Sequence, residues 1–169
     1  MIFVTVGTHE QAFNRLLKKV NMLIEKGIIQ EKVIMQTGFS DYKPKECTVY
    51  PFLSFEKMNK YINDARIVIT HGGPASFLEV LQAGKTPIVV PRQEKYSEHI
   101  NNHQVDFVKI VEKKMNNIIP VYNIDELDQV IVKYDELSRS MQGISNNNNK
   151  FNNKFEAIVD ELFGNNHLI

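Results

Sequence analysis

Short apolar runs rich in β-branched residues alternate with longer stretches of helical period along this chain. Each short run has the length of a buried strand, and each longer stretch places apolar residues on one face of a helix. Strands are predicted at residues 2–6, 32–36, 47–50, 66–70, 87–90 and 118–122. Helices are predicted after Phe13, after the capping residue Ser54, at 74–83, from Ser97 or Glu98 with Ile100 facing inward, and from Asp125. This order predicts an α/β fold in which helices flank a parallel sheet.

A single domain covering residues 1–169 is expected, because 169 residues with 43% hydrophobic content can bury one core. Six of the nine residues at 145–153 are Asn. That composition predicts a flexible connector or the frayed start of a last helix at 154–164.

The charge balance argues against general nucleic-acid binding, because 20 Lys and Arg residues are matched by 20 Asp and Glu residues. Cys47 is the single cysteine, which excludes a disulfide within the chain and a thiolate-rich metal site. The amino terminus lacks the basic region of a signal peptide, and no apolar run reaches the ~18 residues of a membrane span. We therefore expect a cytoplasmic protein that reaches a membrane only through a partner.

Small, polar and bendable residues follow several predicted strands. They are Gly7-Thr8-His9 after the first strand, Thr37-Gly38 after the second, His71-Gly72-Gly73 after the fourth and Pro91-Arg92 after the fifth. The carboxyl ends of parallel strands share one edge, where strand-to-helix loops and helix N-termini form a crevice. We expect the functional site at this edge.

The loop from His71 to Ser76 is typical of a phosphate site. Gly72 and Gly73 let backbone amides approach a ligand, and the helix that follows directs its N-terminal dipole to the same place. Ser76 is a candidate donor to a phosphate oxygen, and Glu79 is a candidate acceptor for two ribose hydroxyls. The structural alternative is a tight turn with Ser76 as a cap and Glu79 as a solvated carboxylate.

The segment after the fifth strand is unusually polar for the start of a helix. Arg92 is expected to pair with phosphate or with Glu98, and His99, His103 and Gln104 are expected to face the crevice. His99 and His103 also have the i, i+4 spacing of two metal ligands, but no third ligand is evident. The plainer alternative for His103 is a buried histidine beside an aromatic residue.

These residues carry a family resemblance. The runs VTVGTHEQAFNRLL, QTG, HGGPASFLEVLQAGKTPIVVPR and EHINNHQVDFVKIVE resemble the small subunit of bacterial two-chain capsule and exopolysaccharide β-1,4-galactosyltransferases. More distantly, the chain is similar to the small subunit of the eukaryotic two-chain N-acetylglucosaminyltransferase of dolichol-oligosaccharide synthesis. Such domains are of the glycosyltransferase family 28 C-terminal type.

The resemblance implies a Rossmann-like sheet equivalent to the C-terminal half of a GT-B glycosyltransferase. It implies a UDP-sugar donor, with the diphosphate on the glycine loops and the hexose near His99. The implied donor-binding residues are Gly7, Thr8, Gly38, His71, Gly72, Gly73, Ser76, Glu79, Arg92, Glu98, His103 and Gln104. The implied acceptor is a polyprenyl-diphosphate-linked saccharide at the inner face of the plasma membrane, held by a membrane-anchored acceptor-binding subunit.

An inverting hexosyl transfer, with galactose implied as the hexose, needs a general base and stabilisation of the departing UDP. The candidate catalytic bases are His9, Glu10 and His99. No metal and no cofactor are expected, because no convincing Asp-x-Asp pair is present. The alternatives are a non-catalytic UDP-sugar-binding subunit and an N-acetylglucosaminyltransferase of the same fold. An epimerase is disfavoured, because the chain lacks the dinucleotide glycine fingerprint and a Tyr-x-x-x-Lys pair in the expected context.

Overall fold

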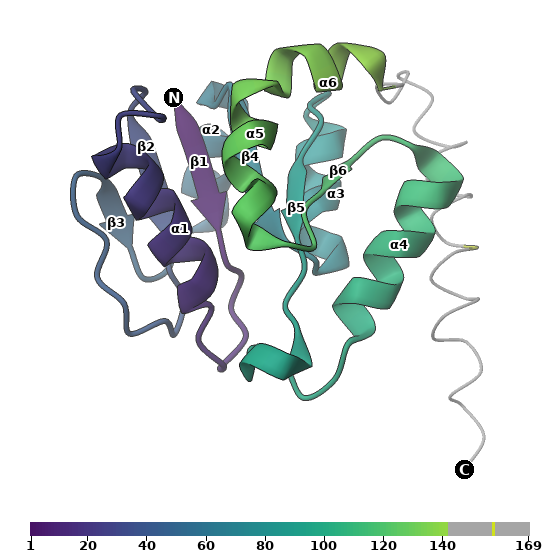
Figure 1. The fold of residues 1–169 in the computed structure, drawn as a ribbon, viewed down its shortest axis with the longest axis horizontal. Coiled ribbons are helices and arrows are strands. Elements are labelled where there is room, and N and C mark those ends of the chain that lie inside the picture. The colour runs from purple at the N-terminus through teal and green to yellow at the C-terminus, as the bar shows by residue number, and fades with distance from the viewer. Residues whose placement is uncertain (142–156, 158–169) are drawn as a thin grey trace.

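The computed structural model describes residues 1–141 and residue 157. Six parallel strands form one sheet in the order β3-β2-β1-β4-β5-β6 (Figure 1). The strands are β1 (Ile2–Thr5), β2 (Val33–Gln36), β3 (Thr48–Tyr50), β4 (Ile67–His71), β5 (Ile88–Val90) and β6 (Ile119–Pro120). The predicted α/β, Rossmann-like fold is confirmed.

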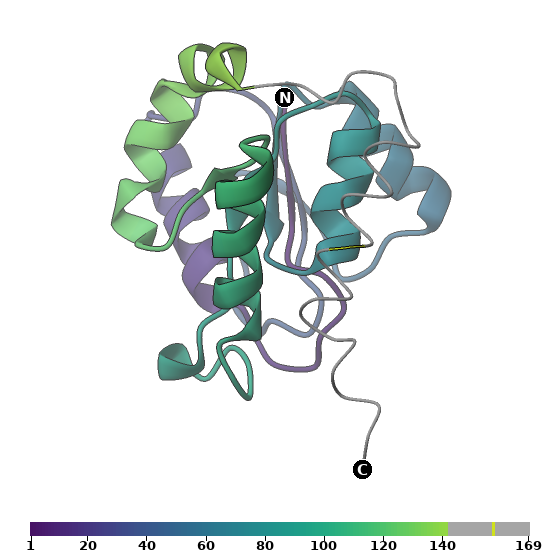
Figure 2. The same cartoon turned by 90° about the vertical axis from the view of Figure 1, so that its right-hand side faces the viewer.

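Helices cover both faces of this sheet. They are α1 (Asn14–Glu25), α2 (Phe55–Asp64), α3 (Pro74–Gln82), α4 (His103–Met115), α5 (Leu127–Val132) and α6 (Tyr134–Ser140), with short 3₁₀ turns η1 (Glu94–Tyr96) and η2 (Ile124–Glu126). Figures 1 and 2 show α1 and α5 on one face and α2 and α3 on the other. The strands run downward in Figure 1, so their carboxyl ends meet at its lower edge. In the described residues, no helix is long and apolar enough to cross a membrane.

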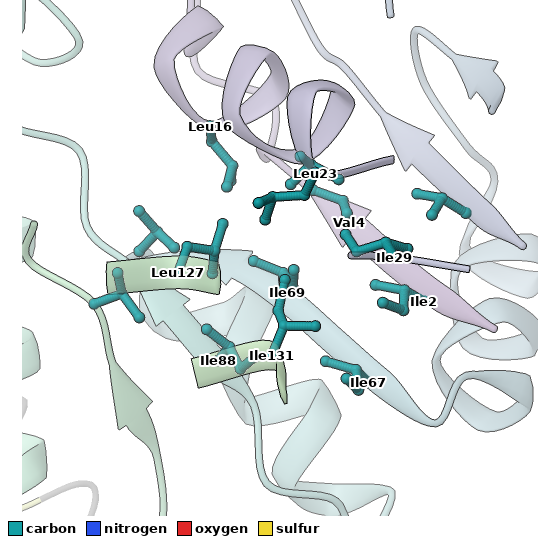
Figure 3. Packing of buried hydrophobic residues seen from close by; sticks show 14 of the residues in the cluster. Ile2, Val4, Leu16, Leu23, Ile29, Ile67, Ile69, Ile88, Leu127 and Ile131 are labelled. Carbon is teal, nitrogen blue, oxygen red and sulfur yellow. The ribbon is translucent and has the colours of Figure 1, made fainter. Parts of the chain in front are cut away.

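The largest hydrophobic cluster lies between the sheet and the helices α1 and α5. Figure 3 shows part of it: Leu16, Leu23, Leu127 and Ile131 of the helices pack over Ile2, Val4, Ile67, Ile69 and Ile88 of the strands. All of them are buried, and full burial of such a side chain contributes about 2 kcal/mol. The helical period of α1 explains this packing and fixes the helix beside β1.

Two helix boundaries agree with the sequence prediction. The Ser54 hydroxyl accepts a hydrogen bond from the Lys57 amide at 3.3 Å and caps α2. Helix α3 begins with Pro74 at its first turn, where no intrahelical N–H partner is needed, and its chain turns away at Gly84 with φ of 73°. These boundaries place the start of α3 at the loop edge of the sheet.

The prediction that a helix starts at Ser97 or Glu98 is wrong. Helix α4 begins at His103, and Ser97 has a left-handed φ of 56°. Ile100, expected on a buried helical face, is 75% exposed. The segment forms a loop because Glu98 is buried in a network with other elements, described below.

The chain after β5 differs from the prediction in two further ways. The strand expected at 118–122 is only β6, and the helix expected from Asp125 is divided into η2, α5 and α6. The cap is Asn123, whose side chain accepts from the Asp125 amide at 3.1 Å. The predicted Asn-rich segment at 145–153 and last helix at 154–164 lie outside the described residues, except for helical Ala157.

Candidate functional site

A cavity of about 510 Å³ opens at the carboxyl edge of the sheet. It lies between the loop after β1 and the start of α3, where the sequence predicted a site. Its lining residues are Thr5, Gly7, Thr8, His9, Gln36, Leu53, Phe55, Met58, His71, Gly73, Pro74, Ala75, Ser76 and Glu79. A volume of this size is within the usual range of small-molecule sites.

His71, the last residue of β4, lies at the centre of the site. Its Nδ1 accepts a hydrogen bond from the Gly73 amide at 3.0 Å, and its Nε2 lies 2.9 Å from the Ser76 Oγ. Burial is the main cause that lowers the pKa of His71 to about 4, and the charge of Arg92 adds to it. The imidazole is therefore neutral at physiological pH.

Two glycines make room for this imidazole. A Cβ atom at Gly7 would lie 2.3 Å from the His71 Nε2, and one at Gly73 would lie 2.1 Å from its Cε1. Gly7 also has a positive φ of 74°. Gly7 and Gly73, which were expected near the diphosphate, therefore make room for the His71 ring within the protein itself.

The amides of Gly72 and Gly73 are already donating within the chain. Gly72 N–H donates to the Gln104 Oε1 at 3.0 Å, and Gly73 N–H donates to His71 as described above. The sequence interpretation, in which both amides face a diphosphate, does not describe this structure. The donors that remain toward the cavity are the Ser76 hydroxyl and the Ala75 amide, because Pro74 has no N–H and the Ser76 amide donates to the Gly73 carbonyl at 3.2 Å.

The floor of the cavity is polar and fully paired. Thr5 donates through its hydroxyl to the Gln36 Oε1 at 2.6 Å, and the Gln36 Nε2 donates to the carbonyls of Gly7 and Pro51 at 3.0 and 3.1 Å. These bonds tie the ends of β1, β2 and β3 together. Gly38 does not line the cavity, but a Cβ there would lie 2.6 Å from the Gly7 oxygen.

The apolar wall of the cavity consists of Leu53, just before α2, and of Phe55 and Met58 in the first turn of α2. Glu79 of α3 lines the same cavity. Burial raises the pKa of the Glu79 carboxyl above its ordinary value. A cavity lined by both apolar side chains and a carboxylate suits a ligand with a flat ring and hydroxyl groups.

A second cavity of about 240 Å³ lies beside the first. Gly72, Gly73, Pro74, His99, His103, Gln104 and Phe107 line it. The His99 ring contacts the His9 ring edge to face, with centroids 4.6 Å apart, and His9 belongs to the first cavity. Burial, followed by the influence of His9, lowers the pKa of His99. The two cavities therefore meet near a histidine pair and the Gly73 backbone.

Arg92 lies outside both cavities and is completely buried. Its guanidinium donates to the carbonyls of Gln11 at 2.7 Å, Val6 at 2.9 Å and Glu98 at 3.0 Å. It also stacks 4.9 Å above the Phe13 ring. Burial lowers the pKa of Arg92 to about 10, against the opposing effect of Glu98. In this position Arg92 ties the loop after β1 to the loop after β5, and its Nε, which has no hydrogen-bond partner, is buried outside both cavities.

Glu98 is also buried, with a side chain only 3% exposed. Its two carboxylate oxygens accept from the Nε and an Nη of Arg15 at 2.8 Å each, and one of them accepts from the Gln93 amide. Arg15 also donates to the Pro91 carbonyl and lies over the Tyr96 ring. This network fastens the loop that carries His99 to the start of α1.

Most sequence-predicted site residues lie in the cavities. The first contains Gly7, Thr8, His9, His71, Gly73, Ser76 and Glu79, and the second contains Gly72, Gly73, His99, His103 and Gln104. The structure does not bring Glu10, Gly38, Arg92 or Glu98 into either cavity, and Glu10 is exposed. The donor and base roles of all these residues stay predictions.

Sequence reasoning missed the apolar wall, the polar floor and Arg15. A signal existed for the wall, because the apolar residues Leu53 and Phe55 follow the third predicted strand within five residues, at the loop edge. Gln36, at the end of an apolar strand, also pointed to a buried polar contact. Nothing local marked Arg15 as the partner of Glu98, since the two are 83 positions apart.

No three His, Cys, Asp or Glu side chains in residues 1–141 and 157 converge as ligands for a metal ion. His99 and His103, the spacing pair noted in the sequence, line one cavity without a third ligand there among these residues. The expectation of a metal-independent reaction stays a prediction.

The curated proteins to which the chain is similar carry the same name in different organisms. The chain is 24% identical over 161 residues to the UDP-N-acetylglucosamine transferase subunit ALG13 of Candida albicans, covering 92% of this chain and 50% of that protein. It is 31% identical over 122 residues to the human protein of the same name, and the match covers 67% of this chain and 10% of that protein. The chain thus spans half the length of the first relative and a tenth of the second.

Among solved structures, the chain is similar to the glycosyltransferase SnogD from Streptomyces nogalater. The identity is 14%, the TM-score is 0.43, and the match covers 83% of this chain and 40% of that one. The model of the glycosyltransferase family 28 C-terminal domain matches residues 1–162, nearly the whole chain. The chain therefore belongs to the glycosyltransferase family 28 C-terminal domain family.

Proposed function

We propose that this chain is the donor-binding part of a UDP-sugar-dependent glycosyltransferase. The observation that carries the proposal is the cavity of about 510 Å³ at the N-terminus of α3, which is lined by Ser76, Glu79 and the apolar wall of Leu53, Phe55 and Met58. In this proposal the diphosphate lies at the Ser76 hydroxyl and the helix N-terminus, where anions are stabilised. The ribose lies at Glu79 and the uracil against Leu53 and Phe55.

The reaction requires little chemistry from this chain beyond positioning and charge stabilisation. The acceptor hydroxyl oxygen attacks the anomeric carbon, a base takes its proton, and the bond to the UDP oxygen breaks with inversion. His9 and His99, in contact at the junction of the two cavities, are the base candidates nearest the diphosphate. Glu10, also predicted as a base, lies outside the cavities. The helix dipole and Ser76 stabilise the leaving diphosphate, and no metal or cofactor is proposed.

The donor hexose has two candidates. The names of the curated relatives support N-acetylglucosamine. The resemblance of the sequence to bacterial capsule and exopolysaccharide enzymes supports galactose and a β-1,4 linkage. In either case the hexose lies near His99, His103 and Gln104, in the second cavity.

The partner and acceptor follow from the same reasoning. The curated relatives are named as subunits. As the equivalent of half of a GT-B glycosyltransferase, which the resemblance implies, this domain would supply one wall of a two-domain cleft. We therefore propose a membrane-anchored acceptor-binding subunit and a polyprenyl-diphosphate-linked saccharide acceptor. The chain would then work at the cytoplasmic face of a membrane. A non-catalytic role, with the base in the partner, is the alternative.

Isothermal titration of the chain with UDP, UDP-N-acetylglucosamine, UDP-galactose and UDP-glucose tests the donor site. Glu79→Gln should weaken UDP binding about tenfold, because a hydrogen bond to a charged group is lost. Glu136→Gln on the exposed surface of α6 is the matched control and should bind as the wild type does. No binding of any uridine nucleotide, or equal losses in both variants, would overturn the proposal.

The same titrations rank the hexoses, since the second cavity should favour the true donor over UDP alone. Tighter binding of UDP-N-acetylglucosamine supports the first candidate, and tighter binding of UDP-galactose supports the second. Transfer assays with the partner subunit and a lipid-linked acceptor then separate the catalytic role from binding alone. His9→Gln that abolishes transfer but keeps UDP affinity would assign the base to this chain.

A further inference from the structure

The ring of His71 makes hydrogen bonds through both of its nitrogens. The Gly73 amide donates to Nδ1 at 3.0 Å, the Gln104 Nε2 lies 3.3 Å from the same atom, and Nε2 lies 2.9 Å from the Ser76 Oγ. A backbone N–H group can only donate a hydrogen bond, so the nitrogen that faces the Gly73 amide must accept. Nδ1 of His71 must therefore be the unprotonated nitrogen.

This assignment fixes the direction of the next hydrogen bond. A neutral imidazole with an unprotonated Nδ1 carries its proton on Nε2, so Nε2–H donates and the Ser76 oxygen accepts. The hydroxyl hydrogen of Ser76 then has to point elsewhere. Within residues 1–141 and 157, no protein group accepts a hydrogen bond from it, and Ser76 lines the first cavity.

The ring has no room to turn away from this arrangement. The backbones of Gly7 and Gly73 lie against it so closely that a Cβ on either would overlap its atoms, at 2.3 and 2.1 Å. Burial and the nearby Arg92 lower the pKa of His71 to about 4, so the ring stays neutral and keeps one donor and one acceptor. The hydroxyl hydrogen of Ser76 is thereby kept pointing away from His71 before any ligand arrives.

We propose that His71 is a positioning residue that holds the Ser76 hydroxyl as a hydrogen-bond donor to a phosphate oxygen of the nucleoside diphosphate. The inference rests on the proposed donor site and assigns His71 an indirect role. A phosphate oxygen only accepts hydrogen bonds, so a serine that already accepts from histidine presents the one group that the ligand needs. His71 itself makes no contact with the phosphate.

A double-mutant cycle on UDP affinity tests the inference. His71→Asn keeps an acceptor for the Gly73 amide near the position of Nδ1 and removes the donor to Ser76. His71→Asn and Ser76→Ala should each weaken UDP binding about tenfold, the effect of one hydrogen bond to a charged ligand. The double variant should bind within about twofold of Ser76→Ala, because both changes remove the same interaction. Two independent losses that multiply to about a hundredfold would overturn the inference.

Uridine provides a readout that a merely structural role of His71 would change. It has no phosphate, so His71→Asn should leave its affinity, measured by NMR titration, within about twofold of the wild type. A parallel loss of uridine and UDP binding would show that His71 supports the whole cavity and would overturn the inference. If wild-type protein bound uridine but not UDP, the diphosphate site and this inference would both fail.

The tautomer can be measured without any substitution. Long-range ¹H–¹⁵N correlation spectra of the wild-type imidazole at pH 7 should show the proton of His71 on Nε2. A proton on Nδ1, or on both nitrogens, would overturn the inference even if UDP binds as proposed. This measurement distinguishes a failure of the inference about His71 from a failure of the proposed donor site, and it does not depend on whether His71→Asn folds.

Discussion

At the scale of single residues, the site is organised around a histidine ring held between two glycines. The sequence predicted that Gly72 and Gly73 let backbone amides approach a ligand closely. In the structure, Gly7 and Gly73 lie close to the ring of His71, and close approach to a ligand stays a prediction. The ring of His71 occupies the space that a Cβ would take at either position. The need for glycine therefore arises inside the protein, before a ligand is considered.

Gly73→Ala should reduce UDP affinity by at least tenfold, because its Cβ would lie 2.1 Å from the His71 Cε1 and must displace the ring. Isothermal titration measures the loss. Gly27→Ala is the matched control: its Cβ meets nothing within 4 Å, but its φ of 70° costs about 1 kcal/mol of stability. If both variants bind UDP equally, the close packing around His71 has no part in binding.

At the scale of elements, the loop between β5 and α4 shows why a local pattern misplaced a helix start. Residues from Ser97 onward have a polar and apolar spacing compatible with a helix. Their conformation is decided instead by Glu98, which is buried against Arg15 of α1 and the Gln93 amide. Contacts between distant elements override local preference here, and a single sequence does not display them.

Glu98→Gln should destabilise the protein by about 3 kcal/mol, because it leaves the Arg15 guanidinium partly buried without a counter-charge. Urea unfolding at pH 7 gives the change in the free energy of unfolding. Asp64→Asn breaks the exposed i, i+4 pair with Lys60 and is the matched control, with an expected cost below about 0.5 kcal/mol. Similar changes in the free energy of unfolding for the two variants would show that the Glu98 network does not stabilise the fold.

At the scale of the whole molecule, the sheet could be predicted well and the site only in part. Parallel strands have a local signature of short β-branched runs, so five of the six were found to within one residue at either end, and the short β6 to within two. The loops were correctly placed at one edge, because that follows from parallel order alone. The apolar wall of Leu53, Phe55 and Met58 depends on how α2 packs, which the pattern does not specify.

Acid should destabilise the whole fold in two separate steps. The pKa of His71 is about 4 in the folded chain against an ordinary value of 6.5, so the unfolded chain binds this proton first as the pH falls. The contribution of His71 to the free energy of unfolding is fully present above pH 6.5 and is lost as the pH falls toward 4, by up to about 3 kcal/mol. His99, whose pKa is also lowered, adds to the same step.

The second step belongs to Glu31, whose pKa the Arg66 guanidinium lowers to about 2 from 4.5. Its contribution is present above pH 4.5 and is lost as the pH falls toward 2. Chemical unfolding measured from pH 7 to pH 3 should show the first step clearly and the beginning of the second. His71→Asn should flatten the first step and leave the second; an unchanged first step would contradict the assignment to His71.

The outer strand β6 restricts how another protein can pair with the sheet at this edge. Ile119 and Val121 donate their amides inward, to the carbonyls of Pro87 and Val89, so the residue between them faces outward. That residue is Pro120, which has no N–H to offer. A strand from another chain that extended the sheet at β6 would find no donor at this point. The exposed aromatic side chains Phe39, Phe52 and Phe55 at the loop edge, by contrast, need no backbone pairing to make a contact.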